Sequence, residues 1–338
     1  MRLYCGIDLH SNNAYTVVLD EQDQVVYRRR LRNELELILE ELAPFAEQLS
    51  GIVVESTYNW YWLIDGLMDA GYRLHLANPG AMQQYSGLKF ADDSSDARWL
   101  AHMLRIGLLP EGYIYPREQR ALRDLLRKRG RLVQLRTANL LSLKNLVHRN
   151  TGQRLAVAAL RTVEFDELDS RHPDPNRTLA LDSTRRVVEC FDSEIHRLEQ
   201  EIQRQLKPDP LLKLLKTVAG VGDILGPMIR LETGEIDRFP SAGHYVSYCR
   251  AVGSQRLSNG KSKGKGNRKN GNPHLAWAYL QAAHYAIRYR KSVRRFYERK
   301  QARTHRVVAL KAVAHKLARA SYYVMRNQVP FKIDLAFG

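Results

Sequence analysis

Four carboxylates in the first hundred residues lie within or beside apolar segments, where burying an isolated charge would cost free energy. Asp8 interrupts an apolar run that predicts a strand, Glu55 ends a second such run, and Asp93 and Asp96 open a helix-like segment. Because isolated carboxylates are expensive to bury, the simplest explanation is a divalent cation that all four share. Carboxylate oxygens suit Mg²⁺ or Mn²⁺. The sequence therefore predicts one metal site made by these four side chains.

Helical phase groups the last two acids. At about 100° per residue, Asp93 and Asp96 share one stripe with Leu100, Met103 and Leu104. The apolar part of the stripe must face the sheet, so both acids are expected to point toward the ends of the two acid-bearing strands. Taken alone, they would be better explained as N-terminal helix acids that complement the macrodipole. The other two carboxylates make the metal site the preferred interpretation.

The elements that must position these acids follow a recognisable order. The pattern predicts three consecutive strands and then alternating helices and strands, at residues 2–9, 14–20, 24–31, 33–49, 51–55, 60–70, 72–77 and 93–107. This order indicates a mixed sheet flanked by helices. It is the order of the RNase H-like fold, in which metal carboxylates lie on the first strand, at the end of the fourth strand and on the closing helix.

Charge divides the chain unevenly. Residues 1–116 hold 9 Lys or Arg and 16 Asp or Glu, whereas residues 117–338 hold 44 and 20, a balance of +24. Basic charge of this size favours a polyanion, and nucleic acid first, as the partner. The alternative is a basic solvated surface on an ordinary enzyme, which the clustering of the charge disfavours.

Cysteine content and hydropathy limit the class of protein. Three cysteines in 338 residues form neither a disulfide framework nor a metal-ligand spacing, which favours a reducing compartment. The first residues lack a signal-peptide pattern, and no apolar run approaches the ~18 residues of a transmembrane helix. We expect a cytoplasmic, nucleoid-associated protein with no membrane partner.

Three domains are expected: residues 1–116, 117–206 and 207–338. The middle one is rich in Leu and Arg and reads as a basic helical hairpin, coiled-coil-like, with breaks near residues 151–152 and 173–176. It dimerises, carries nucleic acid along its basic face, or does both; the alternative is a solvated charged face on a structural coiled coil, and the pattern does not separate these interpretations. The last domain is expected to be mostly helical.

Two segments of the last domain suggest phosphate contacts. Gly220 and Gly222 form a Gly-x-Gly turn between two predicted helices, as in helix-hairpin-helix modules, although such a turn is also simply tight. Residues 254–272 contain six Lys or Arg, four Gly and no acid, which predicts a mobile, phosphate-seeking loop. Its expected nucleic-acid contacts are Arg256, Lys261, Lys263, Lys265, Arg268 and Lys269. The alternative is a disordered linker, but the loop lies between two patterned helices.

At this point the motifs resemble a known family. The matching segments are residues 6–10, 54–57, 89–98, 220–222, 234–239, 258–261 and 266–272, in this order. Over nearly the full length the chain resembles the DEDD transposases of the IS110 insertion-sequence family, which are bridge-RNA-guided recombinases. The resemblance implies a RuvC-like first domain and a transposase domain at the end.

The resemblance also implies roles that composition does not show. A serine in the basic loop would be the nucleophile that attacks a DNA phosphate, and Ser258 is the candidate rather than Ser254 or Ser262. A non-coding guide RNA would pair with donor and target DNA, so that base pairing supplies specificity. A serine hydroxyl needs activation, which the Mg²⁺ site could supply. That chemistry requires the metal site and the serine to meet around one phosphate, within one chain or across a homodimer or homotetramer.

Two competing functions remain open at this stage. A metal-dependent nuclease of the junction-resolvase class would use the same four carboxylates to activate water, with Ser258 as a bystander. A non-enzymatic nucleic-acid-binding protein is the third reading, and the four carboxylates argue against it. Trapping a covalent protein–DNA product separates the first two, and metal-dependent strand cleavage excludes the third.

Overall fold

The computed structural model describes residues 1–82, 93–162, 174–253, 255–259, 261–265 and 270–338. The chain divides into two compact units, residues 1–117 with 254–270, and residues 118–253 with 271–338. Across the described residues, no helix combines the length and the apolar character needed to cross a membrane. The division into three domains expected from the sequence remains a prediction.

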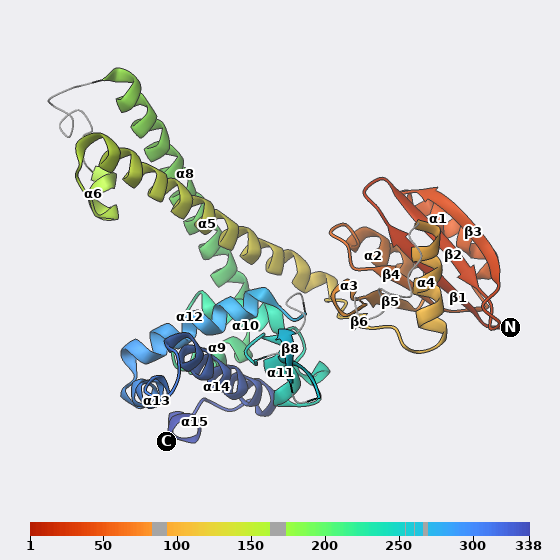
Figure 1. The fold of residues 1–338 in the computed structure, drawn as a ribbon. Helices are drawn as coiled ribbons and strands as arrows, with labels where there is room; N and C mark the ends of the chain where they lie inside the picture. The colour runs from red at the N-terminus through yellow and green to blue at the C-terminus, as the bar shows by residue number, and fades with distance from the viewer. Residues whose placement is uncertain (83–92, 163–173, 254, 260, 266–269) are drawn as a thin grey trace. The chain divides into compact units, whose positions relative to one another are not determined.

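A six-stranded mixed sheet forms the first unit and confirms the predicted fold class (Figure 1). Its strands are β1 (Leu3–Leu9), β2 (Asn13–Leu19), β3 (Val25–Arg32), β4 (Leu49–Glu55), β5 (Leu74–Ala77) and β6 (Glu111–Gly112). Their order is β3-β2-β1-β4-β5-β6. The first three strands pair antiparallel, whereas β4 is parallel to both β1 and β5. This is the arrangement of an RNase H- or RuvC-like α/β domain.

Strand alternation assigns the two faces of the sheet. On β1, Leu3, Cys5, Ile7 and Leu9 pack with two helices, α1 (Leu35–Leu42) and α2 (Tyr61–Asp69). The intervening residues of β1 point to the opposite face, which helix α4 (Asp93–Arg105) covers. The sheet is therefore buried on both sides at its centre, and Asp8 is the one charged residue of β1.

Two features depart from the predicted elements. The helix expected over residues 33–49 ends at Leu42 and continues only as the 3₁₀ turn Ala43–Phe45. Pro44 explains the change, because it has no N–H for the next helical hydrogen bond and its ring crowds the preceding turn. The short strand β6 was not predicted, since a two-residue strand carries no period.

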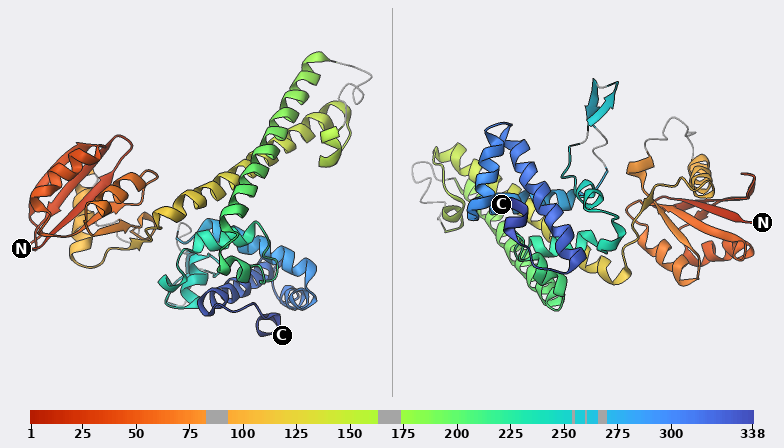
Figure 2. Two further views of the ribbon diagram at one scale, coloured as in Figure 1. Left: turned by 180° about the vertical axis from the view of Figure 1, so that it is seen from behind. Right: turned by 90° about the horizontal axis from the view of Figure 1, so that it is seen from below.

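The second unit begins with a long antiparallel helix pair, α5 (Arg117–Thr151) and α8 (Pro175–Leu206), which lie side by side in both orientations (Figure 2). Arg129 donates to Glu199 at 2.8 Å, and Arg136 donates to Asp192 at 2.6 Å, so ion pairs join the two helices. A short helix, α6 (Val157–Thr162), and a small apolar cluster with Leu143 and Leu181 lie at the far end. The predicted helical hairpin is thus present.

The remaining helices form one apolar core with the near ends of α5 and α8. They are α9 (Pro210–Leu215), α10 (Leu225–Thr233), α11 (Ala242–Tyr248), α12 (Pro273–Tyr289), α13 (Lys291–Gln301), α14 (Arg306–Asn327) and α15 (Ile333–Phe337). Tyr245 and Tyr279 are fully buried at its centre, and their hydroxyls satisfy each other at 2.7 Å. The hairpin β7 (Gln255–Ser258) and β8 (Lys261–Lys265) interrupts this series between α11 and α12.

Candidate functional site

Asp8 and Glu55 lie on the same face of the sheet, at the same end of neighbouring strands. Ile7 pairs with Val54 in the parallel β1–β4 ladder, so Asp8 and Glu55 occupy the next position on each strand. Parallel neighbours are roughly 4.8 Å apart. Both acids alternate with residues that face α1 and α2, which directs them to the α4 face. Asp8 is only 4% exposed.

Helix α4 crosses this face in a register set by small residues. A Cβ on Gly6 would lie 2.0 Å from the carbonyl oxygen of Ala97, so only glycine permits this approach. Farther along α4, Leu104 lies beside Gly51 of β4 and Leu100 packs near Val53. Each such step advances four residues on the helix and two on the strand, about 6 Å in both cases.

Continuing this register by four residues on α4 and two on β4 places the backbone of Asp96 beside that of Glu55. The backbone position of Asp93 continues the stripe of Ala97 and Ala101 beyond Gly6, toward Asp8. The side chain of Asp93 lies outside the described residues. The placement on β1, on β4 and on the closing helix is the one that the sequence predicts.

The opposite end of α4 is anchored to the turn between β2 and β3. Asp23, in a left-handed backbone conformation, accepts hydrogen bonds from Arg98 at 3.0 Å and Arg105 at 3.0 Å, and its carboxylate is 2.7 Å from His102 Nδ1. Burial alone would raise the pKa of Asp23, but the hydrogen bonds and charges of His102 and Arg105 lower it below its ordinary value. This anchor fixes the direction of α4, so that its acidic N-terminal end faces the ends of β1 and β4.

The donor set fits a hard divalent cation in chemistry and in its positions on the fold. Among the described side chains, a set from which that of Asp93 is missing, no three His, Cys, Asp or Glu groups are arranged to hold a metal ion. Aspartate and glutamate oxygens are the ligands that Mg²⁺ and Mn²⁺ prefer. The four-carboxylate site therefore remains a proposal for these residues.

His10 is a neighbour of Asp8 that was not singled out from the sequence. Its Nε2 lies 3.2 Å from Asp8 Oδ2. The backbone carbonyl of His10 accepts hydrogen bonds from the side-chain amides of Asn33 at 3.0 Å and Asn59 at 2.9 Å. Two loops are thereby fastened to the end of β1. The Asp-x-His spacing could have indicated this contact, because residues i and i+2 of a strand share a face.

Ser258 is the last residue of β7, beside a two-residue hairpin turn. It pairs with Lys261, and Asn259 between them has a φ of 52°. The pair Asn259-Gly260 is the commonest sequence of such turns, because both central positions need positive φ. Where composition predicts a mobile loop, the described residues form a short antiparallel hairpin. The local Asn-Gly signal was available in the sequence.

Most predicted contacts of this segment cannot be placed as side chains. Lys261 is exposed. For Ser258, Arg256, Lys263 and Lys265 the structure describes only the backbone, and Arg268 and Lys269 lie outside the described residues. Their roles therefore remain predictions.

The start of α12, which follows the hairpin in the chain, is fixed by a buried polar cluster. Asn272 donates from Nδ2 to Glu232 Oε2 at 2.8 Å, while its Oδ1 caps α12 by accepting from the backbone N–H of His274 at 2.8 Å. Glu232 is fully buried and receives two hydrogen bonds from Arg127 of α5, at 2.6 and 2.8 Å. The backbone N–H of Asn272 also donates to the Tyr248 carbonyl at 2.6 Å. The residues Arg127, Glu232 and Asn272, called the Glu232 cluster below, join α5, α10 and α12.

The two glycines of the predicted Gly-x-Gly turn have different surroundings. Gly220 has a φ of 83°, and a Cβ there would lie 2.1 Å from the carbonyl oxygen of Ala282 in α12. Helix packing therefore explains Gly220. A Cβ on Gly222 would meet nothing within 4 Å, so this position is open. A backbone contact to phosphate at either glycine remains a prediction.

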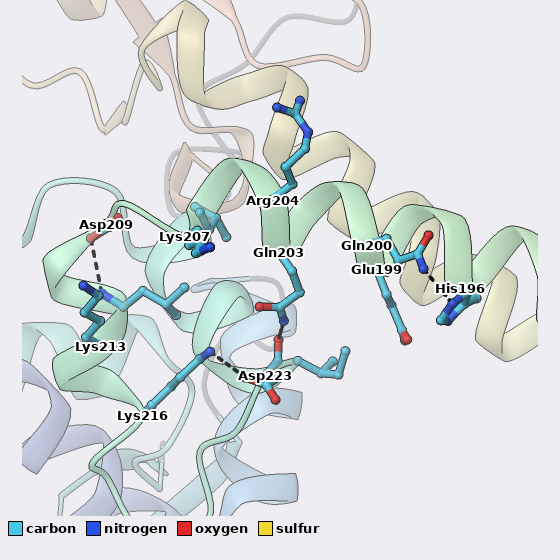
Figure 3. A pocket seen from close by; sticks show the side chains of 13 residues that line it. His196, Glu199, Gln200, Gln203, Arg204, Lys207, Asp209, Lys213, Lys216 and Asp223 are labelled. Atoms are coloured by element: carbon cyan, nitrogen blue, oxygen red, sulfur yellow. Dashed lines mark hydrogen bonds and ion pairs between the residues drawn. The ribbon is translucent and has the colours of Figure 1, made fainter.

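An open groove of about 800 Å³ borders this turn at the foot of α8 (Figure 3). Four cations line it: Arg204, Lys207, Lys213 and Lys216. All three of its acids make contacts that stabilise the fold: Glu199 accepts from Arg129 at 2.8 Å, Asp209 caps α9 and receives Arg230 at 2.8 Å, and Asp223 pairs with Lys216 at 2.5 Å. The groove is therefore lined by charges of both signs.

Two family models, both of transposases, match the chain. One, a DEDD-class transposase model named for IS110, matches residues 5–150. The other, described as "Transposase IS116/IS110/IS902 family", matches residues 212–298. Together they cover more than half of the chain. The first match contains all four predicted metal ligands, and the second contains Ser258.

Two curated proteins are similar over long segments. A probable family 20 transposase of Pseudomonas aeruginosa is 24% identical over 292 residues, which span 84% of this chain and 83% of that protein. A Streptomyces coelicolor protein, described as an insertion element IS110 uncharacterized 43.6 kDa protein, is 26% identical over 207 residues. That match spans 60% of this chain and 51% of the relative. The family resemblance indicated by the motifs is confirmed, and the chain belongs to the IS110 family of transposases.

Proposed function

We propose that this transposase cuts and rejoins DNA with Ser258 as covalent nucleophile, assisted by a divalent cation at Asp8, Glu55, Asp93 and Asp96. The observation that carries the proposal is the geometry of the α4 face. Two carboxylates lie at the same end of neighbouring parallel strands, and α4 crosses them with its acidic end toward them. Asp8 is buried beside His10, and a cation shared with the other carboxylates would further compensate its charge.

The proposed step is a transesterification. The Ser258 hydroxyl oxygen forms a bond to a DNA phosphorus as one backbone P–O bond breaks; the hydroxyl proton passes to solvent, and the released deoxyribose oxygen takes up a proton. Attack on the serine ester by the free hydroxyl of another strand reverses the step and regenerates Ser258. The number of phosphodiester bonds is conserved, so joining needs no external energy source.

The residues have separable tasks in this proposal. The four carboxylates would hold Mg²⁺ or Mn²⁺, which when bound polarises the phosphoryl oxygen and stabilises the leaving oxygen. Lys261, exposed and paired with Ser258 across the hairpin, would neutralise phosphate charge. The turn at Asn259 follows Ser258, which is the last residue of β7.

The partners follow from charge and family. The +24 balance of residues 117–338 favours phosphate-rich partners, which we propose are donor and target DNA and a non-coding guide RNA. We further propose a homodimer or homotetramer, because joining donor to target requires two cleavage sites at once.

Denaturing electrophoresis with end-labelled donor DNA tests the function. The full-length protein, its co-purified RNA and Mg²⁺ should give a protein-linked DNA band. Ser258→Ala should lose this band and the joined product, and Asp8→Asn should lose both as well. Lys311→Ala, an exposed cation of the last domain that has no role in the proposed site, is the matched control and should keep the band.

Two results would overturn the proposal. Wild-type cleavage without a protein-linked band would indicate hydrolysis by a RuvC-like nuclease. A band that persists in Ser258→Ala would assign the nucleophile to another side chain.

A further inference from the structure

Helix α12 presents an exposed face with unusual side chains for a solvent-facing surface. Trp277 is 44% exposed and Tyr285 is 50% exposed. At 100° per residue, Trp277, His284 and Arg288 lie within about 40° of one another, and Tyr285 borders them. We call these four residues the α12 stripe; it is roughly 17 Å long along the helix.

The stripe is not a misplaced part of the core. The opposite face of α12 packs against neighbouring helices. Its buried residues are Leu275, Ala278, Tyr279, Ala282 and Ala286. Aromatic rings left on the surface beside such a complete packing face mark an interaction site more often than a structural one.

The charge around the stripe selects the class of partner. Residues 273–326 contain 13 Lys or Arg and a single acid, Glu298. Of these cations Arg326 pairs with Asp237, and no other forms an ion pair with a residue that the structure describes. Charge of one sign disfavours a second copy of the same face and favours a polyanion.

Aromatic rings within such a field fit unpaired nucleotides in particular. The faces of bases in a duplex are covered by their neighbours, whereas an unpaired base can stack on a tryptophan ring or an arginine plane. Arg288 lies 5.3 Å above the ring of Tyr289, so cation and ring are already juxtaposed at the end of the helix. Helix α13 continues directly from Arg290 and adds exposed cations, among them Lys291, Arg295 and Arg299.

We propose that the α12 stripe binds unpaired nucleotides of a single-stranded RNA or DNA segment. The base stacks on Trp277, with Tyr285 beside it, and Arg288 and the cations of α13 neutralise the phosphates. The proposal deepens the proposed function, which needs a nucleic-acid partner, but it concerns binding alone and can be measured without cleavage.

Fluorescence anisotropy with full-length protein tests the proposal. The probes are labelled oligouridylate, oligodeoxythymidylate of equal length, and a DNA duplex, each titrated at several salt concentrations. Trp277→Ala should weaken binding of a single strand by about 10-fold, since one base stacked on an aromatic ring contributes roughly that much. Duplex affinity should stay unchanged. Trp277→Phe should keep most of the affinity because it keeps an aromatic face, whereas Trp277→Leu should behave like Trp277→Ala.

The salt dependence separates stacking from charge. Trp277→Ala should leave the slope of log K against log salt unchanged, whereas Arg288→Ala should reduce it by roughly one unit for each phosphate that the protein no longer neutralises. Leu335→Ala, which removes an exposed apolar side chain (86% exposed) from a different helix, α15, is the control and should change nothing.

The outcomes are distinct. An effect on oligouridylate alone identifies RNA as the source, and an effect on both single strands supports unpaired nucleotides of either kind. Unchanged single-strand binding in Trp277→Ala, or an equal loss on the duplex, would overturn the proposal. If wild-type protein forms no covalent adduct at Ser258 but Trp277→Ala still weakens single-strand binding, the proposed function is rejected and the nucleotide-binding site is supported.

Discussion

Removing Arg127 should destabilise the second unit more than removing the charge of its partner Glu232. Arg127 donates two hydrogen bonds to Glu232, which is fully buried, whereas the Arg127 side chain keeps 34% of its exposure. In Arg127→Met the buried carboxylate loses its bidentate cation. In Glu232→Gln the amide oxygen can still accept the hydrogen bond from Asn272. The guanidinium of Arg127, which is partly exposed, can then hydrogen-bond to water.

The magnitude follows from this asymmetry. Breaking a fully buried ion pair costs about 3–5 kcal/mol. Because Arg127 is partly exposed, we expect about 2–4 kcal/mol for Arg127→Met and about 1–2 kcal/mol for Glu232→Gln. For a unit of about 200 residues, each kcal/mol lowers Tm by roughly 2–4 °C. Arg127→Met should therefore lower the Tm of this unit by roughly 4–16 °C.

The pH dependence gives an independent check. Burial raises the pKa of Glu232, but Arg127, by hydrogen bonding and charge, and then Asn272 outweigh it, so the pKa lies below its ordinary value. A carboxyl whose pKa is depressed by folding stabilises the protein above the unfolded pKa of about 4.3 and loses that contribution as pH falls through the folded pKa. The stability gap between wild type and Glu232→Gln should therefore be complete at pH 7 and shrink below about pH 4.

Urea denaturation followed by circular dichroism measures both variants and the double variant Arg127→Met/Glu232→Gln. The two substitutions should be strongly coupled, with the double variant less destabilised than the sum of the single variants. A loss below about 0.5 kcal/mol in Arg127→Met, or a greater loss in Glu232→Gln than in Arg127→Met, would refute the reasoning.

Three further outcomes are expected. Gly6→Ala should leave the first unit unfolded or destabilised by several kcal/mol in urea denaturation, because the new Cβ would lie 2.0 Å from the Ala97 carbonyl oxygen; a stable variant would contradict the packing of α4. Asp23→Ala should cost about 1–3 kcal/mol at pH 7 and less below about pH 4, since the pKa of Asp23 is lowered in the fold. Asn259→Val should reduce formation of the covalent adduct more than Asn259→Gly, because a β-branched residue resists the φ of 52°; equal adduct yields would argue against a role for the turn.

The sequence was sufficient for the sheet and for the positions of the acids. Alternation along β1 and the order of the elements depend on local periodicity, which is why three consecutive strands, and Asp8 at the end of the first, could be predicted. The stripe on α4 was also predictable, because helical phase follows from residue number alone. Helical phase does not determine the register of α4 along the strands. That depends on Gly6 meeting Ala97, a contact between residues 91 positions apart.

How closely the carboxylate side chains approach one another is harder to predict from the sequence. Like charges repel one another, and the strand and helix patterns fix only the backbone positions of these residues, not how closely their side chains approach. The described Asp8, Glu55 and Asp96 are consistent with this, since their backbones are in register while their side chains form no metal-holding group. Position on the fold is therefore the informative quantity here, and metal-dependent cleavage, rather than carboxylate distances, decides the assignment.

The serine hairpin and the helix that follows it depend on two kinds of information, a local sequence signal and contacts between distant residues. The turn of the hairpin is set by two adjacent residues, Asn259-Gly260, and could have been identified from sequence. The helix α12 that follows it in the chain begins after Asn272, which is held by Glu232 and Arg127; these come from helices distant in the chain and had no motif to mark them. A buried carboxylate held by an arginine and an asparagine has few alternative arrangements, so it fixes the position at which α12 begins. The turn beside Ser258 is thus specified locally, whereas the start of α12 is specified only by the tertiary structure. If the Glu232 cluster positions the serine, Glu232→Gln should lower the rate of adduct formation beyond what its small loss of stability explains, while single-strand binding at Trp277 stays unchanged.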